Sequence, residues 1–159
     1  QEVIQLAAAT VETNFFGTIS TFRTLVRPKV NHQLPRYVCE LGIKQADLER
    51  AIDFPLCLEC FLGWCRNYPI YCLDNPNSDK LFGRDILVKN CGLHKVEFPF
   101  KLKRFHNIGR IFRQRGVSVE QGNLMLGAFK EKSGQHPHDA LGDVREIIRG
   151  LQLLKKKVA

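Results

Sequence analysis

The stretch His138-Asp139-Ala140-Leu141-Gly142-Asp143 decides most of what the sequence predicts. It opens a run of apolar residues at helical spacing: Val144, Ile147, Ile148, Leu151 and Leu154. This spacing predicts an amphipathic helix over residues 138–156, with its apolar face on the core. A histidine at the entry of a helix and a carboxylate about one turn later can serve one reaction centre. The imidazole takes a proton near neutral pH, and the carboxylate holds a divalent cation.

The same residues also have a purely structural interpretation. His138 and Asp139 would cap the helix, and Asp143 would be a solvated charge on its first turn. Spacing alone leaves both interpretations open.

The chain before this helix alternates strands and helices. Residues 2–11 and 16–26 are predicted strands, and the polar break at Asn14 and Gly17 predicts a hairpin between them. Residues 27–35 are predicted to be a loop and 69–73 a buried strand. Helical segments are predicted at residues 36–41, 45–51, 54–66, 79–91, 107–114 and 123–132. The pattern predicts one α/β domain over residues 1–159, with a mixed sheet that contains residues 3–10 and 18–26 and with the last helix packed on it.

Composition narrows the class of protein. The chain has 159 residues, 44% of them hydrophobic, and a formal net charge of +8. No apolar run reaches the ~18 residues that a membrane span needs, and no signal peptide is visible. A basic domain favours an anionic partner, of which nucleic acid is the first to consider, although the charge alone also fits a domain without such a partner.

The six cysteines predict packing rather than metal binding. Cys57, Cys60 and Cys65 are spaced C-x2-C-x4-C, but they lie among apolar residues at helical spacing. Small buried thiols are the expected outcome, since no second ligand pair completes a zinc site. Reduced thiols predict an intracellular setting: cytosol, nucleus or organelle matrix.

The pattern His138-x-Ala140-x-x-Asp143 at the start of a C-terminal helix resembles the third motif of DEDDh-type 3′–5′ exonucleases. The order of other segments resembles one branch, the three-prime histone-mRNA exonuclease-like exoribonucleases. These segments are residues 2–8, 22–28, 41–43, 51–55, 105–108 and 134–138. The resemblance implies an RNase H-like exonuclease fold, a mixed β-sheet flanked by helices.

The resemblance also implies the chemistry. In this family four acidic residues bind two divalent ions, Mg²⁺ or Mn²⁺, and a histidine is the general base. By position, His138 matches the base and Asp143 matches the last metal ligand. The second motif needs an aspartate after the strand at 69–73; Asp79 fits best and Asp85 is the alternative, unless both are surface charges. Asp139 has no counterpart in the motif.

Two departures from the family pattern matter. The first motif, Asp-x-Glu on the first strand, is expected upstream of Gln1, unless this copy has lost it. Without its two carboxylates the site would hold two magnesium ions poorly. Leu41 stands where the family has threonine, in the Leu41-Gly42 segment that packs against the terminal nucleotide. Leucine has no hydroxyl to donate to that nucleotide.

The basic residues suggest how RNA is held. Single-stranded ends are gripped by basic grooves and stacked on aromatic rings. Arg104, Arg110, Arg113 and Arg115 are the candidate contacts, although a solvated basic face over a core that contains Phe105 and Phe112 is the alternative.

The leading prediction is a 3′–5′ exoribonuclease that acts on single-stranded RNA 3′ ends with magnesium. The alternative is a degenerate nuclease fold that binds RNA or is a structural part of a larger ribonucleoprotein assembly. No membrane partner is expected. An Asp-x-Glu strand upstream of Gln1 would favour the enzyme, and its absence would favour the alternative.

Overall fold

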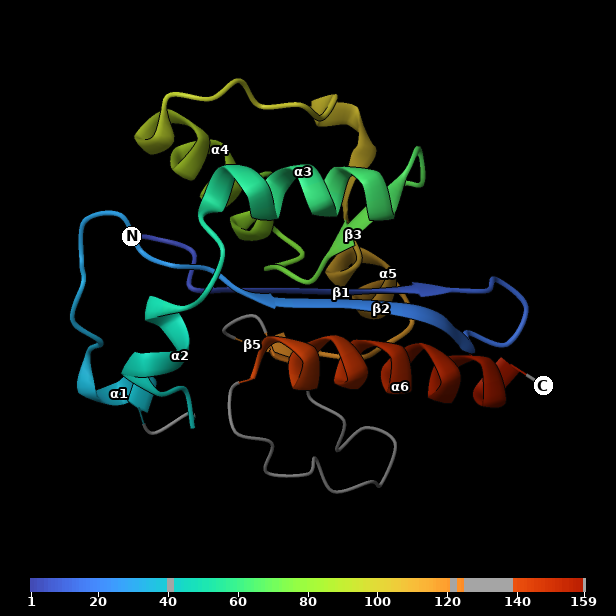
Figure 1. Cartoon of the computed structure of the whole chain (residues 1–159). Coiled ribbons are helices and arrows are strands. Elements are labelled where there is room, and N and C mark those ends of the chain that lie inside the picture. The colour runs from blue at the N-terminus through green and yellow to red at the C-terminus, as the bar shows by residue number, and fades with distance from the viewer. Residues whose placement is uncertain (40–41, 121–122, 125–138, 159) are drawn as a thin grey trace.

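The computed structural model describes residues 1–39, 42–120, 123–124 and 139–158 (Figure 1). Strands β1 (Gln5–Val11) and β2 (Thr18–Leu25) pair antiparallel, with Gln5 opposite Leu25. The turn between them is held by the carboxylate of Glu12, which accepts the backbone N–H groups of Asn14 and Phe15. The predicted hairpin is confirmed, with an irregularity in register between Thr10 and Val11.

Two short helices, α1 (Arg36–Cys39) and α2 (Gln45–Glu49), lead from the hairpin to the longer α3 (Phe54–Cys65). Helix α3 begins where it does because the Asp53 side chain accepts the N–H of Leu56 and Pro55 suits the first turn. A parallel bridge between Val26 and Ile52 ties the end of the hairpin to the entry of α3.

Strands β3 (Ile70–Cys72) and β4 (Phe105–Asn107) are parallel neighbours. Between them run α4 (Phe82–His94) and the short 3-10 helix η1 (Leu102–Arg104). A parallel pair needs such a crossover, because its two strands run in the same direction. Helix α5 (Gly109–Gln114) follows β4 almost directly.

The last part of the chain contains one wrong prediction. A helix was expected over residues 123–132, but Asn123–Leu124 is strand β6, paired antiparallel with β5 (Val119–Glu120). Residues 125–132 lie outside the described part of the chain. Strand β6 contacts the C-terminal helix α6 (Ala140–Val158), so a tertiary neighbour supports extended backbone where the local spacing indicated a helix.

The layers are those of an α/β domain. Helix α3 lies on one side of the β1–β2 hairpin and α6 on the other, and α6 contacts both strands (Figure 1). The predicted fold class and the packing of the last helix are confirmed. The described strands form three two-stranded sheets, one parallel and two antiparallel, in place of the single mixed sheet that the sequence predicted.

Buried side chains form two main clusters. The larger one joins the hairpin, α3, α4 and β4, and includes Val26, Phe54, Phe61, Leu87 and Phe105. The second joins α5 to α6 and includes Ile108, Phe112, Leu151 and Leu154. None of the helices in the described residues is long and apolar enough to cross a membrane.

Candidate functional site

The start of α6 is fastened to both strands of the hairpin. The Gln5 side chain donates from Nε2 to Asp139 Oδ1 at 2.8 Å, and its Oε1 accepts the N–H of Ala140 at 3.0 Å. Arg23 Nη2 donates to the same Asp139 oxygen at 3.0 Å. The side chain of Asp139 is 24% exposed, so these contacts are partly shielded from water. We call Gln5, Arg23 and Asp139 the α6 clamp.

The register of the hairpin explains why the α6 clamp forms. Ala7 lies opposite Arg23, and alternate residues of a strand share a face, so Gln5, Ala7 and Arg23 lie on one face of the hairpin. The other face carries Leu6 and Ala8, which pack against the larger core cluster. Small alanine side chains leave room for α6 to lie against the strands.

His138 and Asp143 are the pair that the resemblance to the exonuclease motif assigns to the site. The structure describes only Asp143. Asp143 is exposed in the first turn of α6, and its backbone N–H donates to the carbonyl of Asp139 at 3.0 Å. His138 lies outside the described residues, so its convergence with Asp143 and Asp79 stays a prediction. The neighbouring residue, Asp139, is fixed by the α6 clamp, and the sequence alone assigned no role to it.

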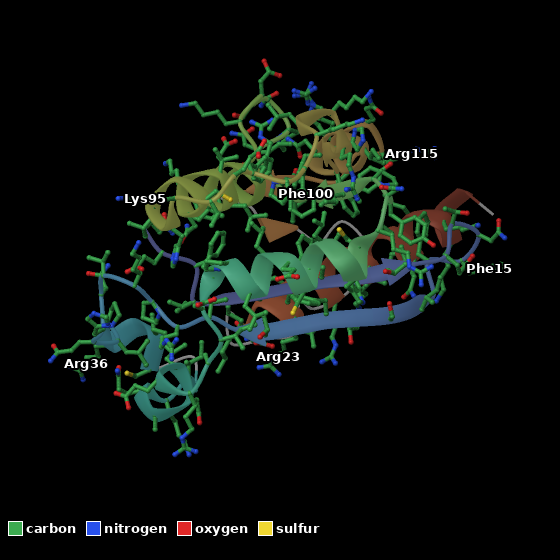
Figure 2. The ribbon with its side chains drawn as sticks, turned by 45° about the horizontal axis from the view of Figure 1, so that its top comes forward. Phe15, Arg23, Arg36, Lys95, Phe100 and Arg115 are labelled. Carbon is green, nitrogen blue, oxygen red and sulfur yellow. The ribbon has the colours of Figure 1, made fainter. Side chains whose placement is uncertain are left out.

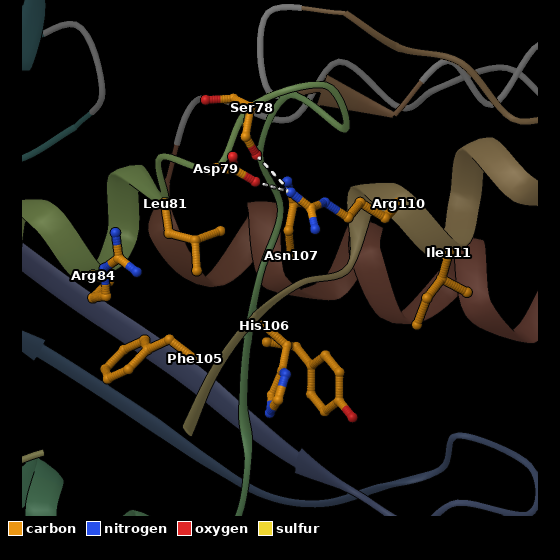
Figure 3. Close-up of a pocket in the computed structure, with 10 residues that line it drawn as sticks. Ser78, Asp79, Leu81, Arg84, Phe105, His106, Asn107, Arg110 and Ile111 are labelled. Atoms are coloured by element: carbon orange, nitrogen blue, oxygen red, sulfur yellow. Dashed lines mark hydrogen bonds and ion pairs between the residues drawn. The ribbon is translucent and has the colours of Figure 1, made fainter. Parts of the chain in front are cut away.

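Asp79 lies in the segment between β3 and α4. Its side chain is fully exposed, and its Oδ1 accepts from Arg110 Nη2 at 2.5 Å. The Ser78 carbonyl accepts from the same nitrogen at 3.3 Å (Figure 3). The alternative, Asp85, is paired with Arg84 at 2.7 Å in the first turn of α4. Both candidates for the second motif are therefore engaged with an arginine.

A third aspartate near this segment, Asp74, has a structural role that the motifs in the sequence do not indicate. Asp74 follows β3 by two residues, and its side chain accepts the backbone N–H groups of Phe82 and Asn75. It thereby caps the start of α4, whose own N-cap residue, Leu81, makes no side-chain cap bond. Its carbonyl oxygen would lie 2.3 Å from a Cβ at position 109, which requires Gly109 there. The signal that could have identified it is its position directly after the predicted strand at 69–73.

Carboxylates of the kind that suits Mg²⁺ are present at the surface of the candidate site. Asp79 and Asp143 are exposed carboxylates, the ligand type that magnesium prefers. Among the described residues, no group of three or more His, Cys, Asp or Glu side chains could hold a metal ion. The sequence contains one Asp-x-Glu, Asp47-Leu48-Glu49, but it lies on α2, where both carboxylates are exposed. It does not match a motif that belongs on a strand.

The basic residues predicted to contact RNA differ in how free they are. Arg104 donates to the carbonyls of Arg66 and Tyr68 at 2.7 and 2.8 Å, and its guanidinium lies 5.5 Å from the centre of the Phe100 ring. It therefore holds the turn after α3, a structural role. Arg110 is half-exposed beside Asp79.

Other predicted contacts lie at the surface. Arg113 donates to the Asn77 side chain, and Arg115 is exposed, well apart from Arg23 (Figure 2). Gly42 is exposed with φ of 78°, and Leu41 lies outside the described residues. Contacts of these residues with RNA stay predictions.

Phe105 and Phe112 are 7% and 0% exposed, which confirms the interpretation that both are core residues. They are therefore not available to stack on a base.

The cysteines follow the prediction except at one position. Cys57 and Cys65 are buried, whereas Cys60 is exposed, so its expected packing role is wrong. Position 60 falls on the outer side of α3, because the helix turns it away from the core that Cys57 and Phe61 share. Burial raises the pKa of the Cys57 thiol to about 12, and nearby Cys60 adds to this effect. A thiol that stays protonated at neutral pH is a poor zinc ligand. All six cysteines are free thiols.

The chain matches a known protein family and resembles several solved structures. The family model described as Exonuclease matches residues 1–151. The nuclease domain of 3′hExo, described as a DEDDh family member and solved with bound rAMP, superposes with a TM-score of 0.80 and 23% identity, over 98% of this chain and 82% of that one.

Two further solved structures resemble this chain. A 3′-exonuclease solved for recognition of the histone mRNA stem-loop has a TM-score of 0.76 and 22% identity, over 98% of this chain and 56% of that one. Cell-death related nuclease 4 has a TM-score of 0.76 and 19% identity, over 98% of this chain and 57% of that one. No curated protein matches. At these identities the likeness concerns the fold, and it confirms the predicted DEDDh exonuclease fold.

Proposed function

This chain belongs to the exonuclease family, and from that premise we propose that the protein is a 3′–5′ exoribonuclease acting on single-stranded RNA 3′ ends. The observation that carries the proposal is the α6 clamp. It fixes the start of α6, the helix that carries Asp143, against the hairpin, in a fold shared with DEDDh nucleases. A fixed position suits a catalytic metal ligand such as Asp143, because misplacement by an ångström can cost about a hundredfold in rate.

The proposed chemistry assigns a role to each carried-over residue. His138 accepts the proton of the attacking water, which suits an imidazole near neutral pH. Asp143 and Asp79 supply carboxylate oxygens for Mg²⁺ or Mn²⁺. Two such ions, when bound, would stabilise charge on the attacking and leaving oxygens.

The pairing of Asp79 with Arg110 bears on this assignment. Asp79 Oδ1 is engaged by Arg110, so a metal ion would compete with the guanidinium for the carboxylate. The pair is exposed on both sides, at 100% and 52% of the side-chain surface. Exposed pairs contribute only ~0–1 kcal/mol, so a divalent ion can displace the arginine at little cost.

The test is a cleavage assay of the full-length protein on 5′-labelled single-stranded RNA. We expect Mg²⁺-dependent shortening from the 3′ end that EDTA stops. Asp143→Asn should abolish it, and His138→Ala should slow it by about 10²–10⁴-fold. RNA binding should survive both changes, because lysine and arginine contacts to phosphate supply most of the affinity.

Asp47→Asn is the matched control, since Asp47 is exposed on α2 in the one Asp-x-Glu pair of the chain. Its rate should equal that of the unaltered protein. Cleavage that persists in Asp143→Asn would contradict the assignment of the metal ligands.

A second candidate function is RNA binding without cleavage, alone or within a ribonucleoprotein assembly. One observation favours it: Asp79, the candidate ligand of the second motif, is engaged with Arg110. In this case the same assay would give tight binding of RNA with no Mg²⁺-dependent shortening.

A further inference from the structure

Two aromatic rings lie exposed side by side on the parallel strands. Tyr71 on β3 and His106 on β4 are direct register partners, and their ring centres are 5.2 Å apart with planes tilted by 33°. Tyr71 is 51% exposed and His106 is exposed. We call Tyr71 and His106 the ring pair.

The ring pair contrasts with its neighbours along the same strands. Ile70 and Phe105, one residue earlier in each strand, belong to the larger core cluster. Side chains alternate between the faces of a strand pair, so the ring pair lies on the face away from this cluster. Packing within that cluster therefore does not explain why both positions carry aromatic rings.

A pocket of about 460 Å³ adjoins the ring pair, within the size range of ligand sites. Arg84, Asn107 and Arg110 line it together with both rings. Figure 3 shows His106 at one end of the pocket and Arg110 at the other. The pocket thus combines aromatic surface at one end with a cationic group at the other, which suits a base and its phosphate.

The two arginines of the pocket are not equally available. Arg84 bonds Asp85 through both Nε and Nη2, at 2.8 and 2.7 Å, and its side chain is 23% exposed. Arg110 is 52% exposed and makes one ion pair, to the fully exposed Asp79. Such a pair is weak and screened by salt, so Arg110 can turn to a phosphate without a large loss.

We propose that Tyr71 and His106 form a stacking platform for one base of single-stranded RNA, with Arg110 binding the adjacent phosphate. The inference rests on the proposed function, in which RNA is the partner, and it adds a nucleotide subsite on β3 and β4. Asp79, the proposed metal ligand, lines the same pocket, but stacking on Tyr71 and His106 does not depend on cleavage, since neither ring has a proposed catalytic role.

The first test is binding of fluorescein-labelled single-stranded RNA in EDTA, followed by fluorescence anisotropy. Tyr71→Ala and His106→Ala should each raise Kd by about 5- to 150-fold, the range for loss of a base–ring stack. Tyr71→Phe keeps the ring and should stay within about twofold. Tyr68→Ala is the matched control, because Tyr68 is 53% exposed but does not line the pocket. An equal loss in Tyr68→Ala, or no loss in Tyr71→Ala, would overturn the subsite.

The contribution of Arg110 is measured by the dependence of the RNA Kd on salt concentration. Arg110→Gln should reduce the slope of log Kd against log salt concentration by about 0.7, the value for one phosphate contact to a single strand. An unchanged slope would remove Arg110 from the subsite.

A second measurement uses the unaltered protein and so does not depend on how the variants fold. RNA that carries 4-thiouridine should photo-crosslink to Tyr71 or His106, as mapped by mass spectrometry of the peptides. Crosslinks confined to other segments would refute the platform. Failure of cleavage with these crosslinks intact would overturn only the enzymatic proposal, whereas cleavage without them would overturn only the subsite.

Discussion

Asp139 and Asp79 are two aspartates of the candidate site in opposite circumstances. Asp139, at the start of α6, is 24% exposed and receives bonds from Gln5 on β1 and Arg23 on β2. Asp79, before α4, is fully exposed and is paired with Arg110. The sequence assigned a role to Asp79 and none to Asp139. The comparison teaches that a residue's position in a sequence motif does not tell how firmly the fold holds its side chain. Asp139 fixes the start of α6 to the hairpin, whereas the single exposed ion pair of Asp79 can be exchanged for a ligand.

Removing Asp139 should have the largest effect on stability. Asp139→Ala takes away two charge-assisted hydrogen bonds and a negative charge at a helix start, so we expect a loss of about 2 kcal/mol in unfolding free energy. Urea denaturation followed by circular dichroism measures this loss. Asp139→Asn keeps the shape without the charge and should lose about half as much. A loss below about 0.5 kcal/mol would place Asp139 with exposed aspartates such as Asp79.

Gln5 should matter less, because Arg23 still holds Asp139 after its removal. Gln5→Ala loses one bond to a carboxylate and one from the N–H of Ala140, and should destabilise by about 1 kcal/mol. Hydrogen exchange at Ala140 should speed up, and the double variant with Asp139→Ala should lose less than the sum of the two. Strict additivity would show that the α6 clamp does not act as a unit.

Glu2 is a third carboxylate to compare, because its contacts in the folded state change its pKa and so make stability depend on pH. Burial by itself would raise the pKa of Glu2, but bonds from Asn31 and from the backbone N–H groups of Lys29 and Val30 hold it below the usual value. A lowered pKa means that its stabilisation is present above the unfolded pKa of about 4.3 and is lost as pH falls through the folded pKa.

Replacement of Glu2 should therefore reduce the loss of unfolding free energy that occurs as the pH falls from 7 to 3. Glu2→Gln should cost about 0.5 kcal/mol at pH 7, a small amount because the group is largely solvated, and progressively less below pH ~4. Thermal melts between pH 3 and 7 measure this, with Glu49→Gln on α2 as control. The stability difference between Glu2→Gln and the unaltered protein should shrink towards pH 3. A difference that grows towards pH 3 would contradict a lowered pKa for Glu2.

Asp79 should show the smallest effect on stability. Asp79→Asn should change the unfolding free energy by less than about 0.5 kcal/mol, and high salt should erase the change, because the ion pair with Arg110 is exposed. Under the proposed function the same variant loses Mg²⁺-dependent cleavage. A loss above about 1 kcal/mol would show that Asp79 is structural, as Asp139 is.

The parts of the fold that were predicted correctly are those with local signals. Residues 2–11 and 16–26 carry β-favouring residues around a polar break, and the structure has a hairpin there. Asp53 and Pro55 predict the start of α3, and the apolar spacing after position 140 predicts α6.

Failures arose where packing against the rest of the chain decides the outcome, as at strand β6, which contacts α6. Asn123–Leu124 is extended beside Val119–Glu120, although its apolar spacing indicated a helix. Cys60 shares its motif with two buried cysteines but faces solvent, since the rotation of α3 distributes the three positions around the helix. Periodicity does not report which side of a helix the rest of the chain will cover.

The sequence by itself determined the family, the α/β class, and the residue types of the candidate site, because strand and helix periodicity and the spacing of His138 and Asp143 are properties of consecutive residues. The tertiary structure alone decided which partners each carboxylate has and how far each is exposed. Gln5 and Asp139 are separated by 134 positions, and the register of β1 against β2 together with the packing of α6 brings them to 2.8 Å. A contact between residues so distant depends on the whole fold, since no local pattern encodes which strand face a helix will cover.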